Sequence, residues 1–330
     1  MRKTVCATLA VMMSVLFSPL SQAGQAWESY KARFFKPEGR IVDTGNGGVS
    51  HTEGQGFAML MAVANDDKAT FDKLWQWTNR ELKNKENGLF YWRYNPAESN
   101  PVADKNNAAD GDVLIAWALL KADARWHEKR YGAASDAITK ALVAHSVIRY
   151  AGYRVMLPGV QGFKLDGEVV LNPSYFVFPA WQAFAGRSHL PVWRDLIKDG
   201  KRLLGKMGSG KANLPTDWVS LASGGKLEPA KGWPPRMSYD AIRIPLYLAW
   251  SDKQSPLLTP WKAWFGQFPR EQTPAWVNVT TNEYAPYMME GGLLAVRDLT
   301  MGQSSGEPEI TSKDDYYSAS LKMLAWISAQ

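Results

Sequence analysis

The chain has 330 residues, and its 38 lysines and arginines outnumber its 32 aspartates and glutamates by six. This excess is scattered rather than clustered, so the sequence shows no basic stripe that would predict a nucleic-acid partner. A chain of this length can bury a large core unaided, and its single cysteine, Cys6, excludes an internal disulfide.

The first 23 residues have the pattern of a secretory signal peptide. A basic start precedes an apolar run over residues 5–20, and residues 21–23 (SQA) fit the small-residue pattern that signal peptidase cleaves. The run is short for a membrane span and no second run follows, so we expect no stable membrane insertion. We expect cleavage near Ala23, a periplasmic or secreted location and one domain over residues 24–330. An uncleaved N-terminal anchor is the alternative.

Beyond this leader, apolar residues recur mainly at helical spacing, which predicts an all-α protein. The expected helices cover residues 25–35, 53–65, 68–83, 111–127, 131–149, 173–186, 190–205, 239–251, 258–267, 283–297 and 313–328. Few segments alternate as strands do, and residues 169–171 (VVL) form the one short strand expected. Paired helices within one domain predict an α/α toroid, in which an outer ring of helices wraps an inner ring. A generic helical bundle is the alternative.

The connections between these helices are of unequal length. Those near residues 66 and 188 are tight, whereas the long ones are rich in Gly, Pro, Trp and Asn and cover residues 84–110, 150–172, 206–238 and 298–312. Long loops in a compact domain are usually functional or disordered. If short and long loops alternate, the long ones lie at one end of the toroid, where they would build a cleft.

Three acidic residues stand at the starts of expected helices: Glu53, Asp110 and Asp240. Alternate helices of a toroid run parallel, so these carboxylates would meet at the end with the long loops. Glycoside hydrolysis needs such a group, with one acid for the leaving oxygen and another to activate water or attack carbon. The alternative is ordinary helix capping, because acids are favoured at helix N-termini; Thr52 and Gln55 even have capping-box spacing.

Other catalytic or cofactor-binding patterns are weak. The four histidines, His51, His127, His145 and His189, do not have the spacing of metal ligands. The Gly-x-Gly of residues 54–56 follows no expected strand, and no serine stands in a nucleophile-elbow motif. We therefore expect no metal and no cofactor.

At the acidic residues the chain resembles glycoside hydrolase family 8. Segment 109–122 (ADGDVLIAWALLKA), closing with Trp126, resembles that family's signature, with Ala109 where Ser or Thr is usual. The other matching segments are 52–57 (TEGQGF), 172–175 (NPSY) and 239–243 (YDAIR), with a weaker echo at 316–317 (YY). The resemblance therefore spans nearly the whole chain beyond the leader.

This resemblance implies an (α/α)6 barrel and an inverting mechanism. By motif position, Glu53 would be the general acid and Asp240 the general base that activates water. Asp110 would hold the sugar at the cleavage point and support its ring distortion. Arg243 would orient the base or contact the sugar, and Asp112 would be structural.

Aromatic residues in the loops are candidates for stacking on the flat faces of sugars. The expected substrate-binding residues, apart from Arg243, are Trp92, Tyr175, Trp218, Tyr317 and, from its motif, Tyr239. Trp117 and Trp126 recur on helical faces and are expected in the core.

Members of the family act on different polymers, and an aspartate at position 240 resembles the group that contains the cellulases. The chain looks most like the periplasmic cellulases that accompany bacterial cellulose synthase. This resemblance implies an endo-β-1,4-glucanase whose partner is a β-1,4-glucan, with a functional link to a cellulose synthase complex. The alternatives are a chitosanase or xylanase of the same family, and a non-catalytic glycan-binding assembly protein.

Overall fold

The computed structural model describes residues 24–303 and 306–330, so the predicted signal peptide and Cys6 lie outside the described residues. Nearly half of the described chain is helical, and short strands and loops make up the rest. The α-helices are α1 (Gln25–Phe34), α2 (Thr52–Ala64), α3 (Lys68–Glu81), α4 (Ala109–Trp126), α5 (Lys129–His145), α6 (Phe178–Ser188), α7 (Pro191–Leu204), α8 (Arg243–Ser251), α9 (Thr259–Phe265), α10 (Gly291–Thr300) and α11 (Tyr316–Ala329). Three 3-10 turns are η1 (Pro173–Tyr175), η2 (Pro256–Leu258) and η3 (Arg270–Gln272). Within the described ranges, no helix is both long and apolar enough to cross a membrane.

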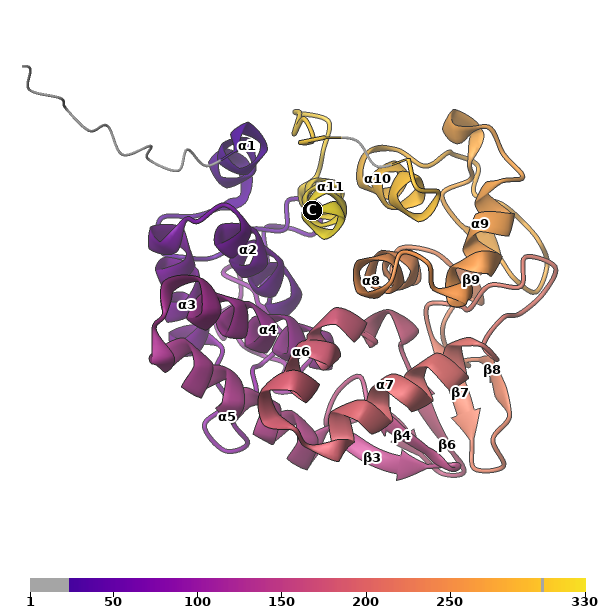
Figure 1. Ribbon diagram of the computed structural model, residues 1–330, viewed down its shortest axis with the longest axis horizontal. Helices are drawn as coiled ribbons and strands as arrows, with labels where there is room; N and C mark the ends of the chain where they lie inside the picture. The colour runs from indigo at the N-terminus through magenta and orange to yellow at the C-terminus, as the bar shows by residue number, and fades with distance from the viewer. Residues whose placement is uncertain (1–23, 304–305) are drawn as a thin grey trace, which may run out of the picture.

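Six helices form a closed ring. Each packs on the next in the order α2, α4, α6, α8, α10 and α11, and α11 returns to α2. Helices α1, α3, α5, α7 and α9 lie outside this ring (Figure 1). The predicted toroid of inner and outer helices, an (α/α)6-type barrel, is therefore confirmed. Helices α10 and α11 are joined by residues 301–315, and the described residues of this connection contain no outer helix.

The inner ring is tightest between α2 and α4, where two glycines face the neighbouring helix. A Cβ atom built on Gly56 would lie 2.5 Å from the Leu114 Cβ atom. A Cβ atom on Gly111 would overlap the Thr52 side chain and lie 2.9 Å from its backbone carbonyl carbon. Only glycine permits this approach, which brings the first turns of the two helices, and the acids on them, side by side.

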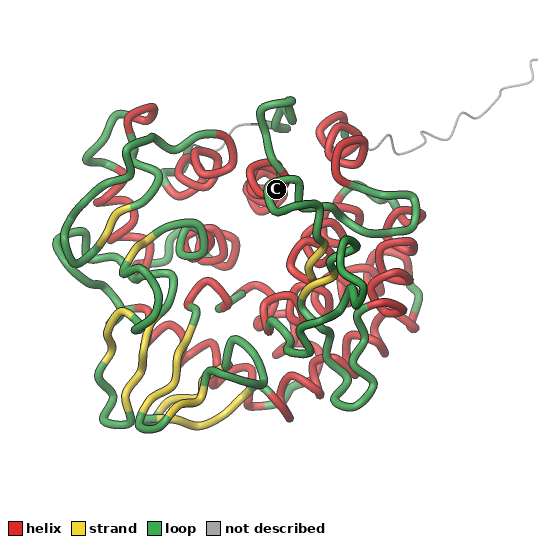
Figure 2. Tube along the Cα trace, turned by 180° about the vertical axis from the view of Figure 1, so that it is seen from behind, coloured by secondary structure: helices red, strands yellow, loops and turns green. Residues whose placement is uncertain are grey.

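Short strands fill the connections between the helices. They are β1 (Ser50–His51), β2 (Arg93–Tyr94), β3 (Val147–Tyr150), β4 (Tyr153–Met156), β5 (Lys164–Leu165), β6 (Glu168–Leu171), β7 (Val219–Ala222), β8 (Leu227–Pro229), β9 (Arg236–Met237) and β10 (Val277–Asn278). Strands β5 to β8 form an antiparallel sheet in chain order, which lies at one edge of the molecule (Figure 2). The expected strand at 169–171 is confirmed within β6, whereas the others were not predicted.

Four predicted helices begin or end four or more residues away from the expected position. The helix expected over 131–149 ends at His145, because residues 147–150 pair with β4 across a turn whose residues Ala151 and Gly152 have positive φ angles of 48° and 80°. The helix expected from residue 173 begins at Phe178, with Pro179 in its first turn, after the separate turn η1.

The other two corrections lie close to the acids. The helix expected from residue 239 begins at Arg243, so Asp240 lies in the preceding turn rather than on the helix. The helix expected from residue 283 begins at Gly291, because Tyr284 and Met288 form bridges with the segment before them.

The four long connections end where inner helices begin. They lead into α4, into η1 and α6, into α8 and into α11, whereas the short connections lead from inner to outer helices. Because the first turns of α2, α4, α8 and α11 share one set of contacts around Arg243, these helices begin at the same end of the ring. The long connections therefore border the end at which the acids gather.

Candidate active site

Glu53 lies in the first turn of α2, which a histidine caps. The His51 Nδ1 atom accepts a hydrogen bond from the Gly54 N–H at 3.3 Å, and its Nε2 atom lies 3.1 Å from Asp43 Oδ2. Because Nδ1 accepts, Nε2 carries the ring proton and donates it to Asp43. The capping box suggested by Thr52 is wrong: Thr52 is the first helical residue rather than the cap.

Asp110 lies in the first turn of α4, and the tight packing of α4 on α2 places it next to Glu53. Its side chain is almost wholly buried, and Oδ1 accepts a hydrogen bond from the Gly111 N–H at 2.8 Å. A buried carboxylate with a second carboxylate beside it costs free energy when both are ionised. Helix capping alone does not account for this placement.

Arg243, the first residue of α8, joins the three predicted acids. Its Nη1 atom lies 2.6 Å from Glu53 Oε2, and its Nη2 atom lies 3.0 Å from Asp240 Oδ1 and 3.7 Å from Asp110 Oδ2. Nη2 also donates to the Ser174 hydroxyl at 3.0 Å. The guanidinium is buried, so these contacts are little screened by solvent.

Three tyrosines extend this network outward from Arg243. Arg243 Nη1 donates to the Tyr317 hydroxyl at 3.3 Å, and the Tyr317 hydroxyl donates to the backbone carbonyl of Tyr239. The Tyr239 hydroxyl in turn lies 3.1 Å from that of Tyr287. Tyr287 was not predicted as a site residue, since its segment was expected to be helical and carries no motif.

Two hollows are lined by residues that contact Arg243. The first, here the acidic hollow, has a volume of about 180 Å³, and among its lining residues are Glu53, Asp110, Trp92 and Tyr175. It therefore brings together two predicted catalytic residues and two predicted stacking rings. Trp92 is half-buried there, and its indole N–H donates to Asp104 at 2.7 Å.

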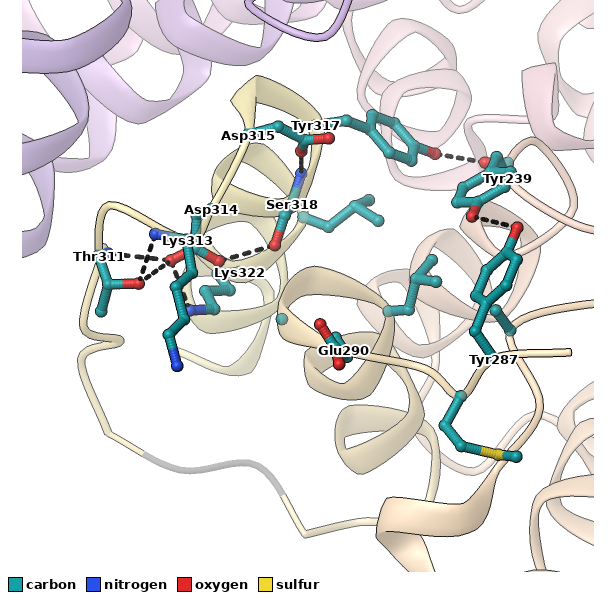
Figure 3. A pocket seen from close by; sticks show the side chains of 15 residues that line it. Tyr239, Tyr287, Glu290, Thr311, Lys313, Asp314, Asp315, Tyr317, Ser318 and Lys322 are labelled. Carbon is teal, nitrogen blue, oxygen red and sulfur yellow. Dashed lines mark hydrogen bonds and ion pairs between the residues drawn. The ribbon is translucent and has the colours of Figure 1, made fainter. Parts of the chain in front are cut away.

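The second, here the tyrosine hollow, has a volume of about 470 Å³ and lies between the starts of α10 and α11. Its rim includes Tyr239, Tyr287 and Tyr317, and Figure 3 shows the hydroxyls of the first two pointing at each other. Tyr239 and Tyr287 are 45% and 48% exposed, so their rings are open to a ligand. Glu290 and Lys313 supply charged groups to the same hollow.

Trp218 lines neither hollow. Its ring stacks on Trp233, with centroids 4.9 Å apart, and on Phe163, with centroids 5.6 Å apart. It also meets the edge of Tyr175, whose centroid is 6.2 Å away. Trp218 is thus one member of an aromatic cluster beside the acidic hollow rather than an isolated exposed ring.

Burial and mutual repulsion raise the proton affinity of two acids. Burial, and then the charge of Glu53, hold the pKa of Asp110 well above its usual range, although Arg243 opposes the shift. Burial also raises the pKa of Asp240, against the opposing effect of Arg243. Protons are therefore retained in the site at a pH at which exposed aspartates are ionised.

Three carboxyl groups with one guanidinium, beside two hollows and several exposed rings, suit acid–base cleavage of a neutral polymer. One carboxyl group can donate a proton to a leaving oxygen while another activates water. The stacking rings suit sugars, which present flat apolar faces.

Comparison with known proteins agrees with this geometry. The family described as "Glycosyl hydrolases family 8" matches residues 1–330. An endoglucanase of Cellulomonas uda is 61% identical over 303 residues, which cover 92% of this chain and 84% of that protein. The solved structure of endoglucanase Cel10, a family 8 glycosyl hydrolase from Klebsiella pneumoniae, is 65% identical with a TM-score of 0.92, covering 93% of this chain and 99% of that one. A family 8 endo-β-1,4-glucanase from an Achatina fulica gut metagenomic library is 66% identical with a TM-score of 0.92, covering 94% and 99%.

Proposed function

The chain belongs to glycosyl hydrolase family 8, and from this premise we propose how it acts. It is an endo-β-1,4-glucanase of the cellulase type, which hydrolyses internal bonds of β-1,4-glucan chains. The observation that carries the mechanism is the buried guanidinium of Arg243, which holds Glu53 and Asp240 on its two nitrogens with Asp110 beside them.

In this mechanism, Glu53 protonates the glycosidic oxygen as it leaves, and Asp240 removes a proton from the attacking water. The water approaches the sugar from the opposite face, so the anomeric configuration inverts. Asp110 faces the sugar at the cleavage point and supports the positive charge that develops on its ring. Arg243 holds the three carboxyl groups in fixed relative positions throughout the catalytic cycle.

The glucan lies across the end of the ring at which the inner helices begin. Trp92 and Tyr175 stack on sugars in the acidic hollow, and Tyr239 and Tyr317 contact those in the tyrosine hollow. Trp218 contributes by supporting Tyr175 from the aromatic cluster. Each exposed ring contributes about 1 kcal/mol to binding, by analogy with other aromatic contacts.

The test is reducing-sugar release from soluble cellulose, xylan and chitosan by the purified chain, with Glu53→Gln prepared in parallel as the control. We expect release from cellulose alone, and proton NMR should show the α-anomer first. Release mainly from xylan or chitosan would move the chain to another substrate group of the family. Binding of cello-oligosaccharides without any cleavage would identify a non-catalytic glycan-binding protein.

A finer proposal concerns location and partners. The signal-peptide pattern and the resemblance to periplasmic cellulases support export to the periplasm and a functional link to a cellulose synthase complex. Deletion of the gene in a cellulose-producing host should change the yield or the chain packing of the cellulose, and the wild-type copy should restore both. Restoration by a Glu53→Gln copy would mean that the link does not depend on hydrolysis.

A further inference from the structure

Asp217 is a half-buried carboxylate that the catalytic scheme does not use. It precedes β7, and its Oδ1 atom accepts hydrogen bonds from the backbone N–H groups of Ser238 at 2.9 Å and Ala241 at 2.8 Å. Its Oδ2 atom accepts a further bond from the Ser238 hydroxyl. One carboxylate thus binds both ends of the turn that carries Asp240.

Asp217 is itself held on its other side. Its backbone N–H donates to the Arg236 carbonyl at 2.8 Å. The next residue, Trp218, is fixed between stacked partners, with Trp233 and Phe163 nearly parallel to it. The carboxylate therefore has a rigid base from which to position the turn, in the way that supporting contacts fix functional side chains elsewhere.

We propose that Asp217 is a positioning residue for the general base, because it fixes the turn 238–241 so that Asp240 faces the attacking water. The proposal rests on the proposed function, since it requires Asp240 to act as the base. The N–H groups of Ser238 and Ala241 both bind Asp217, so the turn before α8 is held at two points.

The charge of Asp217 adds a second effect. Burial, and then the charge of Asp240, raise the pKa of Asp217 to about 6. Repulsion between two carboxylates is mutual, so an ionised Asp217 favours the protonated form of Asp240. The other charged groups that act on Asp240 are Arg243 at the start of α8, Glu53 on α2 and Asp110 on α4. Asp217 therefore makes Asp240 a stronger base than Arg243 alone would allow.

Two substitutions separate position from charge. Asp217→Ala removes all three hydrogen bonds, so kcat on soluble cellulose should fall about 100-fold with KM within about threefold, because a displacement of about 1 Å is enough for such a loss. Asp217→Asn keeps an oxygen for the two backbone N–H groups but loses the charge. It should retain most of kcat at its plateau, while the acidic limb of the pH profile moves to lower pH.

Asp199 on α7 provides a matched control, because it is buried and accepts a backbone N–H bond from Arg154 at 2.8 Å, away from the acids. Asp199→Ala should lower the melting temperature and leave the pH profile unchanged. If Asp217→Ala does not fold, Asp217→Asn and Ser238→Ala test the proposal in its place. Ser238→Ala removes one hydroxyl donor to Asp217 and should lower kcat about fivefold.

The inference is overturned if the folded Asp217 variants keep the wild-type kcat and acidic limb, or if Asp217→Asn and Ser238→Ala do so when Asp217→Ala is unfolded. This result differs from failure of the proposed function. A wild-type chain that cleaves no polysaccharide refutes both proposals, whereas an active wild type with indifferent Asp217 variants refutes this one alone.

Discussion

At the scale of single residues, the site is governed by an imbalance of charge. Three carboxyl groups, those of Glu53, Asp110 and Asp240, surround the one guanidinium of Arg243. Full ionisation would leave two uncompensated negative charges in a largely buried place, which is costly. The site therefore favours protonated carboxyl groups, and the pKa values of Asp110 and Asp240 are raised accordingly.

Glu53→Gln tests the general acid. Gln keeps the size of the side chain and an oxygen toward Arg243 but has no proton to donate. Turnover of unactivated cellulose should fall by about 10²–10⁴-fold, while the circular dichroism spectrum and binding of cello-oligosaccharides stay close to wild type. Near-normal turnover would remove Glu53 from the mechanism.

Asp110→Asn separates a role in catalysis from a role in capping. The Asn oxygen can still accept the Gly111 N–H bond, and Asn and Asp are comparable at helix starts. Turnover should nevertheless fall by about 10²-fold or more, because Asn cannot ionise to support the positive charge that develops on the sugar. The melting temperature should stay the same or rise, since a buried carboxyl group becomes neutral. Full turnover would favour capping as the only role of Asp110.

At the scale of elements, the sequence predicts helices well where apolar periodicity is strong and poorly where side chains far away in the sequence decide the outcome. The apolar periodicity that predicts α2 and α4 is contained within each segment, and these helices were expected at nearly their observed positions. The turn that carries Asp240 is held by hydrogen bonds to Asp217, more than 20 residues earlier, and no local pattern contains that information.

The same division applies to the candidate site. Motif position was enough to select Glu53, Asp110, Asp240 and Arg243, and the structure brings all four together. Asp217 lies in no motif, and its proposed positioning role depends only on the groups that its carboxylate binds. Nor does the sequence show that Trp218 is stacked within a cluster, because Phe163 comes from another long connection and Trp233 from a later part of the same one.

Gly111→Ala tests whether close packing of α2 on α4 positions the acids. The new methyl group would overlap Thr52, so the helices must separate. The free energy of unfolding should fall by about 1–3 kcal/mol, and turnover should fall with it because Glu53 and Asp110 move apart.

Gly186 is the matched control for that change. It is an exposed residue of α6 with no atom near its would-be Cβ position. Gly186→Ala should stabilise the protein by about 1 kcal/mol through helix propensity, with activity unchanged. Equal thermal stability and activity in Gly111→Ala and Gly186→Ala would show that the approach of α2 to α4 does not matter.

At the scale of the whole molecule, the ring arranges helix dipoles as well as side chains. Helices α2, α4, α8 and α11 begin at the same end, and the N-terminus of each carries a partial positive charge. These partial charges favour anions at the place where Asp110 is buried and Asp240 is half-buried. The rest of the free-energy cost of burying these carboxylates lowers the stability of the folded chain, which holds several acids in positions that favour their protonated forms.

Asp112 allows this cost to be measured apart from catalysis. It lies two residues after Asp110 and is wholly buried. Burial raises its pKa to about 7, against hydrogen bonds from Asn107 at 2.8 Å and Phe90 at 2.9 Å and the charge of Lys83. The folded chain therefore binds this proton more tightly than the unfolded chain, whose aspartates titrate near pH 4.

The stability that this proton supplies is fully present below about pH 4 and is lost as the pH rises through about 7. Asp112→Asn removes the titration and keeps an acceptor for the Phe90 N–H. Urea unfolding of both proteins at pH 5, 6, 7 and 8 should show the wild type losing stability relative to the variant, with a slope of up to about 1.4 kcal/mol per pH unit. Other acids occur in both proteins and cancel in this difference. A constant offset between the two curves would mean that Asp112 is ionised throughout and that its burial does not shift its titration.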